Sequence, residues 1–211
     1  YTPHPDERAI LMKVMEISPT EDIHSFFDID QSSLNPKWFA YGSFPLYLLK
    51  IIEGLVRGIE LFTEHDIRII ARCISAIADL GTLLATYMIG RRLSGRIAGI
   101  TAMSFLAVSV ISIQNSHFYT VDSLLTLFIT VTIYCVIEFC EKGKTRYLIL
   151  AGVMIGLALG SKISALPIIF LPLVGSYVLL IRNKAKGVNL TLKEQVYPLL
   201  YCAMCAGLVL I

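Results

Sequence analysis

Two adjacent carboxylates, Asp6 and Glu7, stand near the start of the chain and could perform general acid or base chemistry. They follow Pro3 and Pro5, which favour an extended entry to the segment. A helix can begin at Asp6, because acidic residues suit the positive end of the helix dipole. In a soluble protein this pair would be an ordinary helix start. Beside a membrane it becomes a stronger candidate for catalysis.

A second polar group, NSHFYTVD at residues 115–122, places His117 and Asp122 at a predicted turn between two apolar runs. Thr120 or Asp122 could cap the helix that follows, and a capping aspartate can also serve a reaction. His117 could ligate a metal ion, since imidazole is a common ligand. A lone histidine at such a turn is, however, more often an interfacial side chain.

Lys162 is the third candidate. It follows an apolar run at 147–161 that would extend roughly 22 Å as a helix, less than the hydrocarbon core of about 30 Å. Lys162 is therefore expected to lie recessed below the membrane surface, where its ammonium needs an anion. The alternative is that its side chain reaches up to the lipid headgroups. Pro167 and Pro172 are expected to kink the next helix and open room beside it.

The composition indicates the setting of these residues. The chain of 211 residues is 55% hydrophobic and 16% charged, with a mean hydropathy of +0.70. Because about a quarter of the residues in soluble domains are charged, we expect an integral membrane protein. The net charge of +2 gives no indication of a nucleic-acid partner.

Basic residues are concentrated in turns at 91–96, 142–146 and 182–193. Turns rich in Lys and Arg stay in the cytoplasm, so two crossings must separate each neighbouring pair. The apolar runs provide these crossings, and one further run leads into the first basic turn. We expect membrane-crossing helices at 67–90, 97–114, 121–140, 147–161 and 163–182.

Residues 44–62 are apolar enough to cross the membrane, but their charges indicate otherwise. Lys50, Glu53, Arg57 and Glu60 fall on one helical stripe, which a crossing helix would bury in lipid. An amphipathic helix lying along the membrane surface would keep the stripe in water. We therefore predict an interfacial helix here.

The predicted architecture is an all-α, polytopic transmembrane helix bundle in two parts. Residues 1–66 form an extracytoplasmic first loop with juxtamembrane amphipathic helices, the first of them at 6–17, and residues 67–211 form the bundle. The turns at 115–120 and near Lys162 lie on the same outer face as the loop. Because the chain opens without a methionine and closes inside an apolar run, we expect a fragment of a larger fold, truncated at both ends.

Three charged residues belong to the first crossing helix. Arg68 and Arg72 are one turn apart near its outer end, where they can meet lipid phosphates or the acidic loop. Asp79 lies deeper, where an unpaired carboxylate is costly. We expect Asp79 to pair with an arginine of a neighbouring helix or to be protonated.

Several segments carry a resemblance to a known family: HPDE at 4–7, NPKWFAYGSFPLY at 35–47, GRRLSG at 90–95, YTVD at 119–122 and GLALGSK at 156–162. In this order they resemble the C-type membrane glycosyltransferases, in particular the group of protein O-mannosyltransferases and lipid A aminoarabinose transferases. The resemblance covers nearly the whole chain.

The resemblance implies an inverting glycosyltransferase that moves a sugar from a polyprenyl-phosphate-linked donor to a hydroxyl acceptor. The acceptor would be a protein, lipid or glycan at the outer membrane face. Asp6 matches the first-loop aspartate that deprotonates the acceptor, and Glu7 follows it as in the mannosyltransferases. Asp122 matches an acidic position in the second outer loop, and Lys162 a basic one near the donor phosphate.

The chemistry of such a transfer agrees with these assignments. It needs a base for the attacking hydroxyl and positive charge for the departing phosphate. Asp6 can supply the first, and Lys162 the second with help from Arg68 or Arg72.

Other polar residues are secondary candidates. His4, His117 and Tyr119 are expected to lie at or near the lining of the site. The sequence establishes no cofactor with certainty and leaves open the use of a divalent metal. If a divalent metal is used, its expected ligands are Glu7, His117 and Asp122.

The competing class is a transporter or lipid-linked sugar flippase, in which Asp79, Asp122 and Lys162 would line a substrate path. Most of the charge crowds one face, however, and the runs at 97–114 and 121–140 are nearly free of it. A third class, a non-catalytic membrane subunit, would not explain the pair of carboxylates near the N-terminus. The enzyme is therefore preferred.

Overall fold

The computed structural model describes residues 4–17, Pro36, Trp38, 41–56, 64–187 and 192–210. No strand occurs in these residues, which confirms the predicted all-α class. Within the predicted first loop, most of residues 18–40 lie outside them. The helices are α1 (Pro5–Glu16), α3 (Phe44–Val56), α4 (Glu64–Ala107), α5 (Val110–Ser116), α6 (Val121–Lys142), α7 (Thr145–Ser161), the 3-10 helix η1 (Ile163–Phe170), α8 (Leu171–Ala185) and α9 (Leu192–Leu210).

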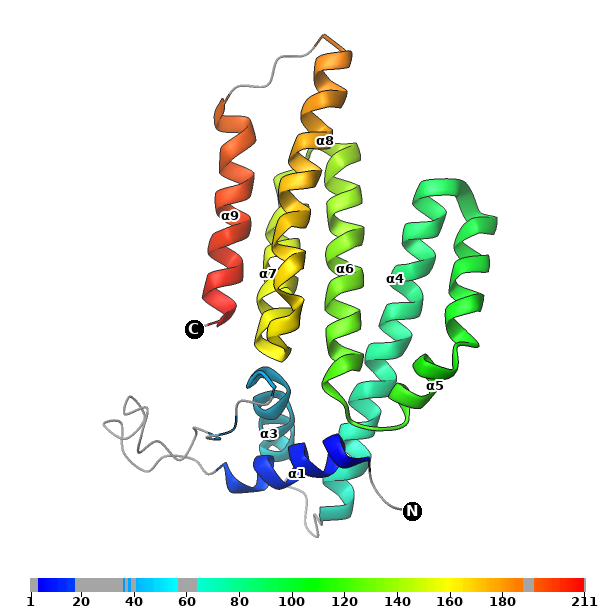
Figure 1. Ribbon diagram of the computed structural model, residues 1–211, viewed down its shortest axis with the longest axis vertical. Helices are drawn as coiled ribbons and strands as arrows, with labels where there is room; N and C mark the ends of the chain where they lie inside the picture. The colour runs from blue at the N-terminus through cyan, green and yellow to red at the C-terminus, as the bar shows by residue number, and fades with distance from the viewer. Residues whose placement is uncertain are drawn as a thin grey trace, which may run out of the picture.

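Three stretches of the described chain are long and apolar enough to cross a membrane: His65–Ala107, Val121–Lys142 and Ile163–Ala185. Thr145–Ser161 and Glu194–Leu210 are shorter apolar helices. Figure 1 shows these elements side by side as an elongated bundle. The predicted crossings at 121–140, 147–161 and 163–182 therefore fall on α6, α7 and the η1–α8 unit. Pro167 lies within η1, so this last crossing begins as a 3-10 helix.

Helix α4 is a hairpin of two limbs, which correspond to the predicted crossings at 67–90 and the start of 97–114. Its helical conformation is broken at Ser94 and Gly95, and Gly95 has a φ of 89° that favours glycine. The chain turns over there and runs back, as Figure 1 shows. The limbs approach closely, since a Cβ at Gly90 would lie 2.8 Å from the Cα of Gly99. The second limb ends at Ala107, so the single helix predicted over 97–114 is wrong.

Helix α6 is central in the bundle, where it contacts α4, α7 and α8, and α9 packs against α7. Small residues allow the α7–α9 approach. A Cβ on Gly152 would lie 2.3 Å from the carbonyl oxygen of Cys202, and one on Gly156 would lie 2.7 Å from that of Ala206. The two backbones therefore approach closely at two positions about one turn apart.

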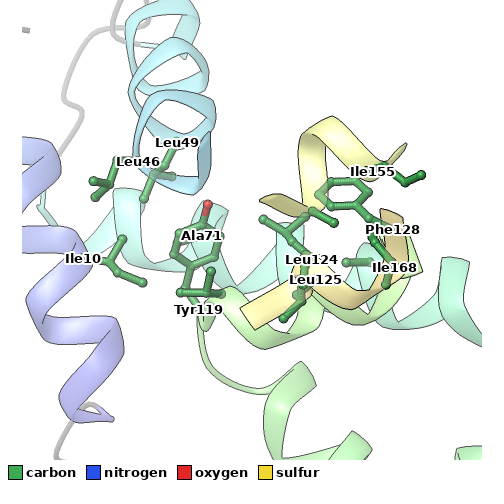
Figure 2. Packing of buried hydrophobic residues seen from close by; sticks show 14 of the residues in the cluster. Ile10, Leu46, Leu49, Ala71, Tyr119, Leu124, Leu125, Phe128, Ile155 and Ile168 are labelled. Carbon is green, nitrogen blue, oxygen red and sulfur yellow. The ribbon is translucent and has the colours of Figure 1, made fainter. Parts of the chain in front are cut away.

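Helices α1 and α3 lie at one end of the bundle, with α1 running across it (Figure 1). The amphipathic character predicted for the helix at 6–17 is confirmed, because Ile10, Val14 and Ile17 are all at most 1% exposed. Figure 2 shows Ile10 beside Leu46 and Leu49 of α3 in this end of the core. Apolar packing between α1 and α3 therefore helps to hold the two helices at this end of the bundle.

The water-facing charged stripe predicted for α3 is wrong at Glu53, which is 1% exposed. Lys50 lies 3.2 Å from its carboxylate and offsets the buried charge. Two other members of the stripe, Arg57 and Glu60, lie outside the described residues. The described part of the helix thus buries one of its charges against the protein.

The two ends of the bundle differ in charge. Helix α1, the α5–α6 turn and the α7–η1 junction lie at the lower end in Figure 1. The basic turns at 91–96 and 142–146 and the basic C-terminal end of α8 lie at the upper end. The predicted candidate groups therefore share one end, opposite the basic turns.

Candidate functional site

Four side chains from separate parts of the chain meet at the lower end of the bundle: Asp6, Tyr41, Asp122 and Lys162. The Lys162 Nζ lies 2.9 Å from Asp122 Oδ1. The same ammonium lies 5.7 Å from the centre of the Tyr41 ring, and the Tyr41 hydroxyl is hydrogen bonded to the Asp6 carboxylate. We call these four residues the acid–lysine cluster. Sequence separation had given no reason for them to meet.

Tyr41 connects the two halves of this cluster. Burial raises the pKa of Tyr41, and its hydrogen bond to Asp6 and the negative charges of Asp6 and Asp122 raise it further. The phenol therefore stays protonated at neutral pH and donates to the Asp6 carboxylate. In the sequence, Tyr41 is one of several aromatic residues in the segment at 35–47, and no local signal distinguishes it from its neighbours.

A close backbone contact places Tyr41. The N–H of Gly42 donates a 2.8 Å hydrogen bond to the carbonyl oxygen of Ser161, directly before Lys162. A Cβ on Gly42 would lie only 1.9 Å from the carbonyl oxygen of Gly160. Only glycine fits at position 42. The close approach of Gly42 to the end of α7 places Tyr41 beside Lys162.

We expect Gly42→Ala to displace this contact and to lower transfer activity together with stability. The new methyl group meets backbone, which cannot rotate away, so the overpacking cost should be about 1–3 kcal/mol. Thermal unfolding and turnover of the full-length protein measure the two effects. Gly54→Ala is the matched control, since a Cβ at Gly54 meets nothing within 4 Å. Equal behaviour of the two variants would contradict the assigned role of Gly42.

Lys162 is placed by the end of α7. It is the C-cap residue, with an extended backbone, and its N–H donates to the carbonyl oxygen of Ala158 at 2.9 Å. Its side chain is 33% exposed and that of Asp122 is 46% exposed, so the pair is accessible to a ligand. The ammonium thus has the anionic partner that its recessed position was predicted to need. Asp122 lies in the first turn of α6, whose N-cap is Thr120.

Glu7 faces away from solvent into a second ion pair. It is fully buried, and both carboxylate oxygens accept from Arg72, Oε1 from Nε and Oε2 from Nη2, each at 2.8 Å. The backbone N–H of Tyr119 also donates to Oε1, at 3.3 Å. The Arg72 guanidinium lies 5.4 Å from the centre of the Phe118 ring. Glu7 therefore ties α1 to α4 and to the α5–α6 turn.

These contacts bear on two predicted roles. Glu7 and Arg72 are engaged with each other, whereas a catalytic carboxylate and a phosphate-binding arginine would each need to face substrate. In this arrangement Glu7 holds the neighbouring Asp6 in place, and Arg72 supports Glu7. The catalytic role of Glu7 and the phosphate-binding role of Arg72 stay predictions.

We expect Glu7→Gln to lower the free energy of unfolding by roughly 2–3 kcal/mol. Breaking a buried ion pair typically costs about 3–5 kcal/mol, and the loss is smaller here because Arg72 is 36% exposed and can be solvated. Thermal unfolding of the full-length protein measures it. The control is Glu16→Gln in the same helix, whose exposed pair with Lys13 contributes at most about 1 kcal/mol. A Glu7→Gln variant that unfolds at the same temperature as the parent would contradict the structural role of the Glu7–Arg72 ion pair.

Arg68 retains unused hydrogen-bonding capacity. Its Nε is buried and has no hydrogen-bond partner among the described residues. It stands one turn before Arg72 at the start of α4. Within the described residues, Arg68 therefore forms no ion pair that would compete with its predicted binding of the donor phosphate.

The three predicted lining residues have different surroundings. His4 caps α1, since its Nδ1 accepts from the Asp6 N–H at 3.3 Å, and it is adjacent to the acid–lysine cluster. His117 is exposed, with Nδ1 2.6 Å from the carbonyl oxygen of Ile113. Tyr119 is fully buried among the core residues in Figure 2, and its hydroxyl donates to the carbonyl oxygen of Pro45 at 2.8 Å. Burial raises the pKa of Tyr119, so it remains a neutral packing residue.

The three residues expected to bind a divalent metal, Glu7, His117 and Asp122, do not lie close together. In the part of the chain that the structure describes, no group of three or more His, Cys, Asp or Glu side chains is arranged to hold a metal ion. Glu7 contacts Arg72, Asp122 contacts Lys162, and His117 lies against its own helix turn. This set therefore forms no common site in the structure.

Asp79 has a partner other than the predicted one. The hydroxyl of Ser112 on α5 donates to Asp79 Oδ1 at 2.6 Å. The expected arginine partner is therefore wrong within the described residues, because the turn after α4 brings a serine to this depth instead. The alternative, a protonated carboxylate, stays a prediction. The contact joins the first limb of α4 to α5.

These features define a multi-pass helical membrane protein with acidic and basic side chains gathered at one end of its bundle. The chain belongs to the dolichyl-phosphate-mannose-protein mannosyltransferase family, whose model matches residues 55–211. It is thus a membrane glycosyltransferase of the C type, as its sequence resemblance predicted. The match includes Asp122 and Lys162 and begins after Asp6 and Tyr41. No curated protein and no solved structure matches the chain.

Proposed function

We propose that the protein transfers a sugar, with inversion, from a polyprenyl-phosphate-linked donor to a hydroxyl acceptor at the outer membrane face. The observation that carries this proposal is the acid–lysine cluster at one end of a membrane glycosyltransferase. It combines a carboxylate beside a half-buried phenol with an accessible ammonium. Transfer from a phosphate ester needs both a base and a cation.

In the proposed reaction, the acceptor hydroxyl oxygen attacks the anomeric carbon of the donor sugar. The bond between that carbon and the phosphate oxygen breaks, and its electron pair remains on the departing polyprenyl phosphate. Asp6 accepts the hydroxyl proton, while Tyr41 orients the carboxylate through its hydrogen bond. Lys162 stabilises the phosphate charge, with Arg68 as a second cation. Asp122 holds Lys162 in place before the donor arrives.

An apolar cavity supports a lipid-linked donor. It has a volume of about 490 Å³ and lies between α7, the η1–α8 unit and α9, lined by residues such as Leu159, Leu173 and Ala206. Leu159 is one turn before Lys162 on α7. A polyprenyl chain in this cavity would therefore have its phosphate near the Lys162 ammonium.

The charge of the opposite end supports an outer position for the cluster. The turns at 91–96 and 142–146 are basic, and such turns remain cytoplasmic in membrane proteins. The acid–lysine cluster lies at the other end of the bundle in Figure 1. We therefore assign it to the extracytoplasmic face.

A transporter or lipid-linked sugar flippase is the alternative, and the carboxylate of Asp79 within the first limb of α4 is the feature that favours it. Its hydrogen bond to Ser112 gives that carboxylate a structural explanation. Flipping moves the intact lipid-linked sugar without breaking the sugar–phosphate bond. Bond cleavage therefore separates the two functions.

The deciding experiment is a turnover assay on the full-length protein with a panel of polyprenyl-phosphate sugars and hydroxyl acceptors, with and without a chelator. The proposal expects release of polyprenyl phosphate with matching formation of glycosylated acceptor. Movement of intact donor across vesicles without either product would favour the transporter. The chelator arm reports whether a divalent metal takes part.

A further inference from the structure

The basic end of the bundle contains a small polar cavity that the proposed reaction does not use. It has a volume of about 250 Å³ and is lined by Met88, Arg91, Arg92, Tyr134 and Glu138. These residues come from the last turns of the first α4 limb and from α6. The cavity is therefore at the opposite end of the bundle from the acid–lysine cluster (Figure 1).

The negative charge in the cavity wall is neutralised within the protein. Arg92 Nε lies 3.0 Å from Glu138 Oε1, and Lys142 contacts the other oxygen of the same carboxylate. Arg92 Nη2 also lies 2.5 Å from Glu141 Oε2. Glu138 is 3% exposed, so its carboxylate serves mainly to fix Arg92 in the wall.

No described residue neutralises the positive charge of Arg91. Its side chain is exposed, and it forms no ion pair or hydrogen bond with any described residue. Two adjacent guanidinium groups and the nearby phenol of Tyr134 thus face one cavity. The two carboxylates beside them, Glu138 and Glu141, both pair with Arg92 and leave Arg91 without a counter-charge in the described chain. Guanidinium groups bind phosphate oxygens through paired hydrogen bonds. The charge of the cavity therefore suits a phosphate group.

An apolar stripe leads along α4 to this cavity. Ile77, Leu80 and Leu84 are 68%, 64% and 57% exposed, and Met88 and Arg91 continue the same spacing of three and four residues, which places all five on one helix face. The stripe from residue 77 to 91 extends about 21 Å at 1.5 Å per residue, enough to span one leaflet of a hydrocarbon core of about 30 Å.

We propose that this cavity binds the phosphate headgroup of an anionic phospholipid whose acyl chain lies along the exposed stripe of α4. The headgroup is held by Arg91 and by the fixed guanidinium of Arg92, with Tyr134 as a neutral donor. The stripe distinguishes a lipid from a soluble phosphate, because a soluble ion would make no use of it. The site is separate from the donor site and tethers the α4–α6 pair to the membrane.

The test uses the full-length protein in detergent, titrated with phosphatidylglycerol, phosphatidylcholine or glycerol 3-phosphate, and native mass spectrometry to count bound molecules. The parent should retain phosphatidylglycerol in preference to phosphatidylcholine. Arg91→Gln should weaken that retention by about tenfold, as expected for lost hydrogen bonds to a charged group. Because Arg91 has no partner to lose, the variant should fold like the parent.

Lys144→Gln is the matched control, since it removes one charge from the same end but does not line the cavity. It should change retention less than about twofold, the effect left to general attraction at a screened surface. Equal losses in the two variants would overturn the site, because they would report general charge alone. Retention of glycerol 3-phosphate as strong as that of the phospholipid would overturn the lipid assignment.

Discussion

Asp6→Asn is expected to lower sugar transfer by about 10²- to 10⁴-fold, the usual loss when general-base assistance is removed. The amide keeps the shape of the carboxylate and can still accept a hydrogen bond from Tyr41, but it cannot take the acceptor's proton. Donor binding should remain largely intact, because the donor phosphate is assigned to other residues. Single-turnover rates and donor binding on the full-length protein measure the two effects separately.

The neighbouring carboxylate provides the internal comparison. Glu7→Gln should act mainly on stability, because Glu7 is buried against Arg72. At a temperature where both variants are folded, Glu7→Gln should retain more activity than Asp6→Asn. A severe loss in Glu7→Gln with an active Asp6→Asn would show that the wrong carboxylate had been assigned. Parental rates in both would place catalysis outside this pair and favour the transporter.

Lys162→Ala is the second large expected effect, and it should weaken donor binding as well as turnover. The ammonium would meet the donor phosphate in the ground state and more strongly as negative charge develops on the leaving group. A hydrogen bond to a charged group contributes about 1.5–3 kcal/mol, so the donor Kd should rise by about tenfold or more. The rate at saturating donor should also fall.

Two further variants distinguish lost charge from lost packing. Lys162→Arg keeps a cation near Asp122 and should recover part of the binding. Lys144→Ala removes a lysine from the other end of the bundle and should leave both constants unchanged. Donor binding that is unaffected by Lys162→Ala would remove this residue from the phosphate site, whatever happens to the rate.

The helices of the bundle could be predicted because each is marked by a pattern within its own segment of the sequence. Apolar runs and basic turns placed α6, α7 and the η1–α8 unit, and the amphipathic helix predicted at 6–17 corresponds to α1. The break between α4 and α5 was missed, since no charge interrupts the apolar residues there. The burial of Glu53 was also missed, because a stripe of charges does not report which member packs against the protein.

The candidate site could be predicted only in part. A short apolar run ending at Lys162 indicated that the lysine needs an anion, and Asp122 lies 2.9 Å away. The Glu7–Arg72 pair joins residues 65 positions apart, and the place of Tyr41 depends on a backbone contact between Gly42 and Ser161. These contacts follow from how the elements pack, which no spacing within one segment reveals.

The proposed transfer is a single displacement at the acid–lysine cluster, so the anomeric configuration of the product distinguishes it from a two-step reaction. The full-length protein would be given a polyprenyl-phosphate sugar of known configuration and a hydroxyl acceptor, and the glycosidic linkage formed would be read by nuclear magnetic resonance. Attack by a hydroxyl activated by Asp6 predicts an inverted linkage. A retained linkage would require a second displacement through an intermediate, and direct attack by the activated hydroxyl would then be wrong.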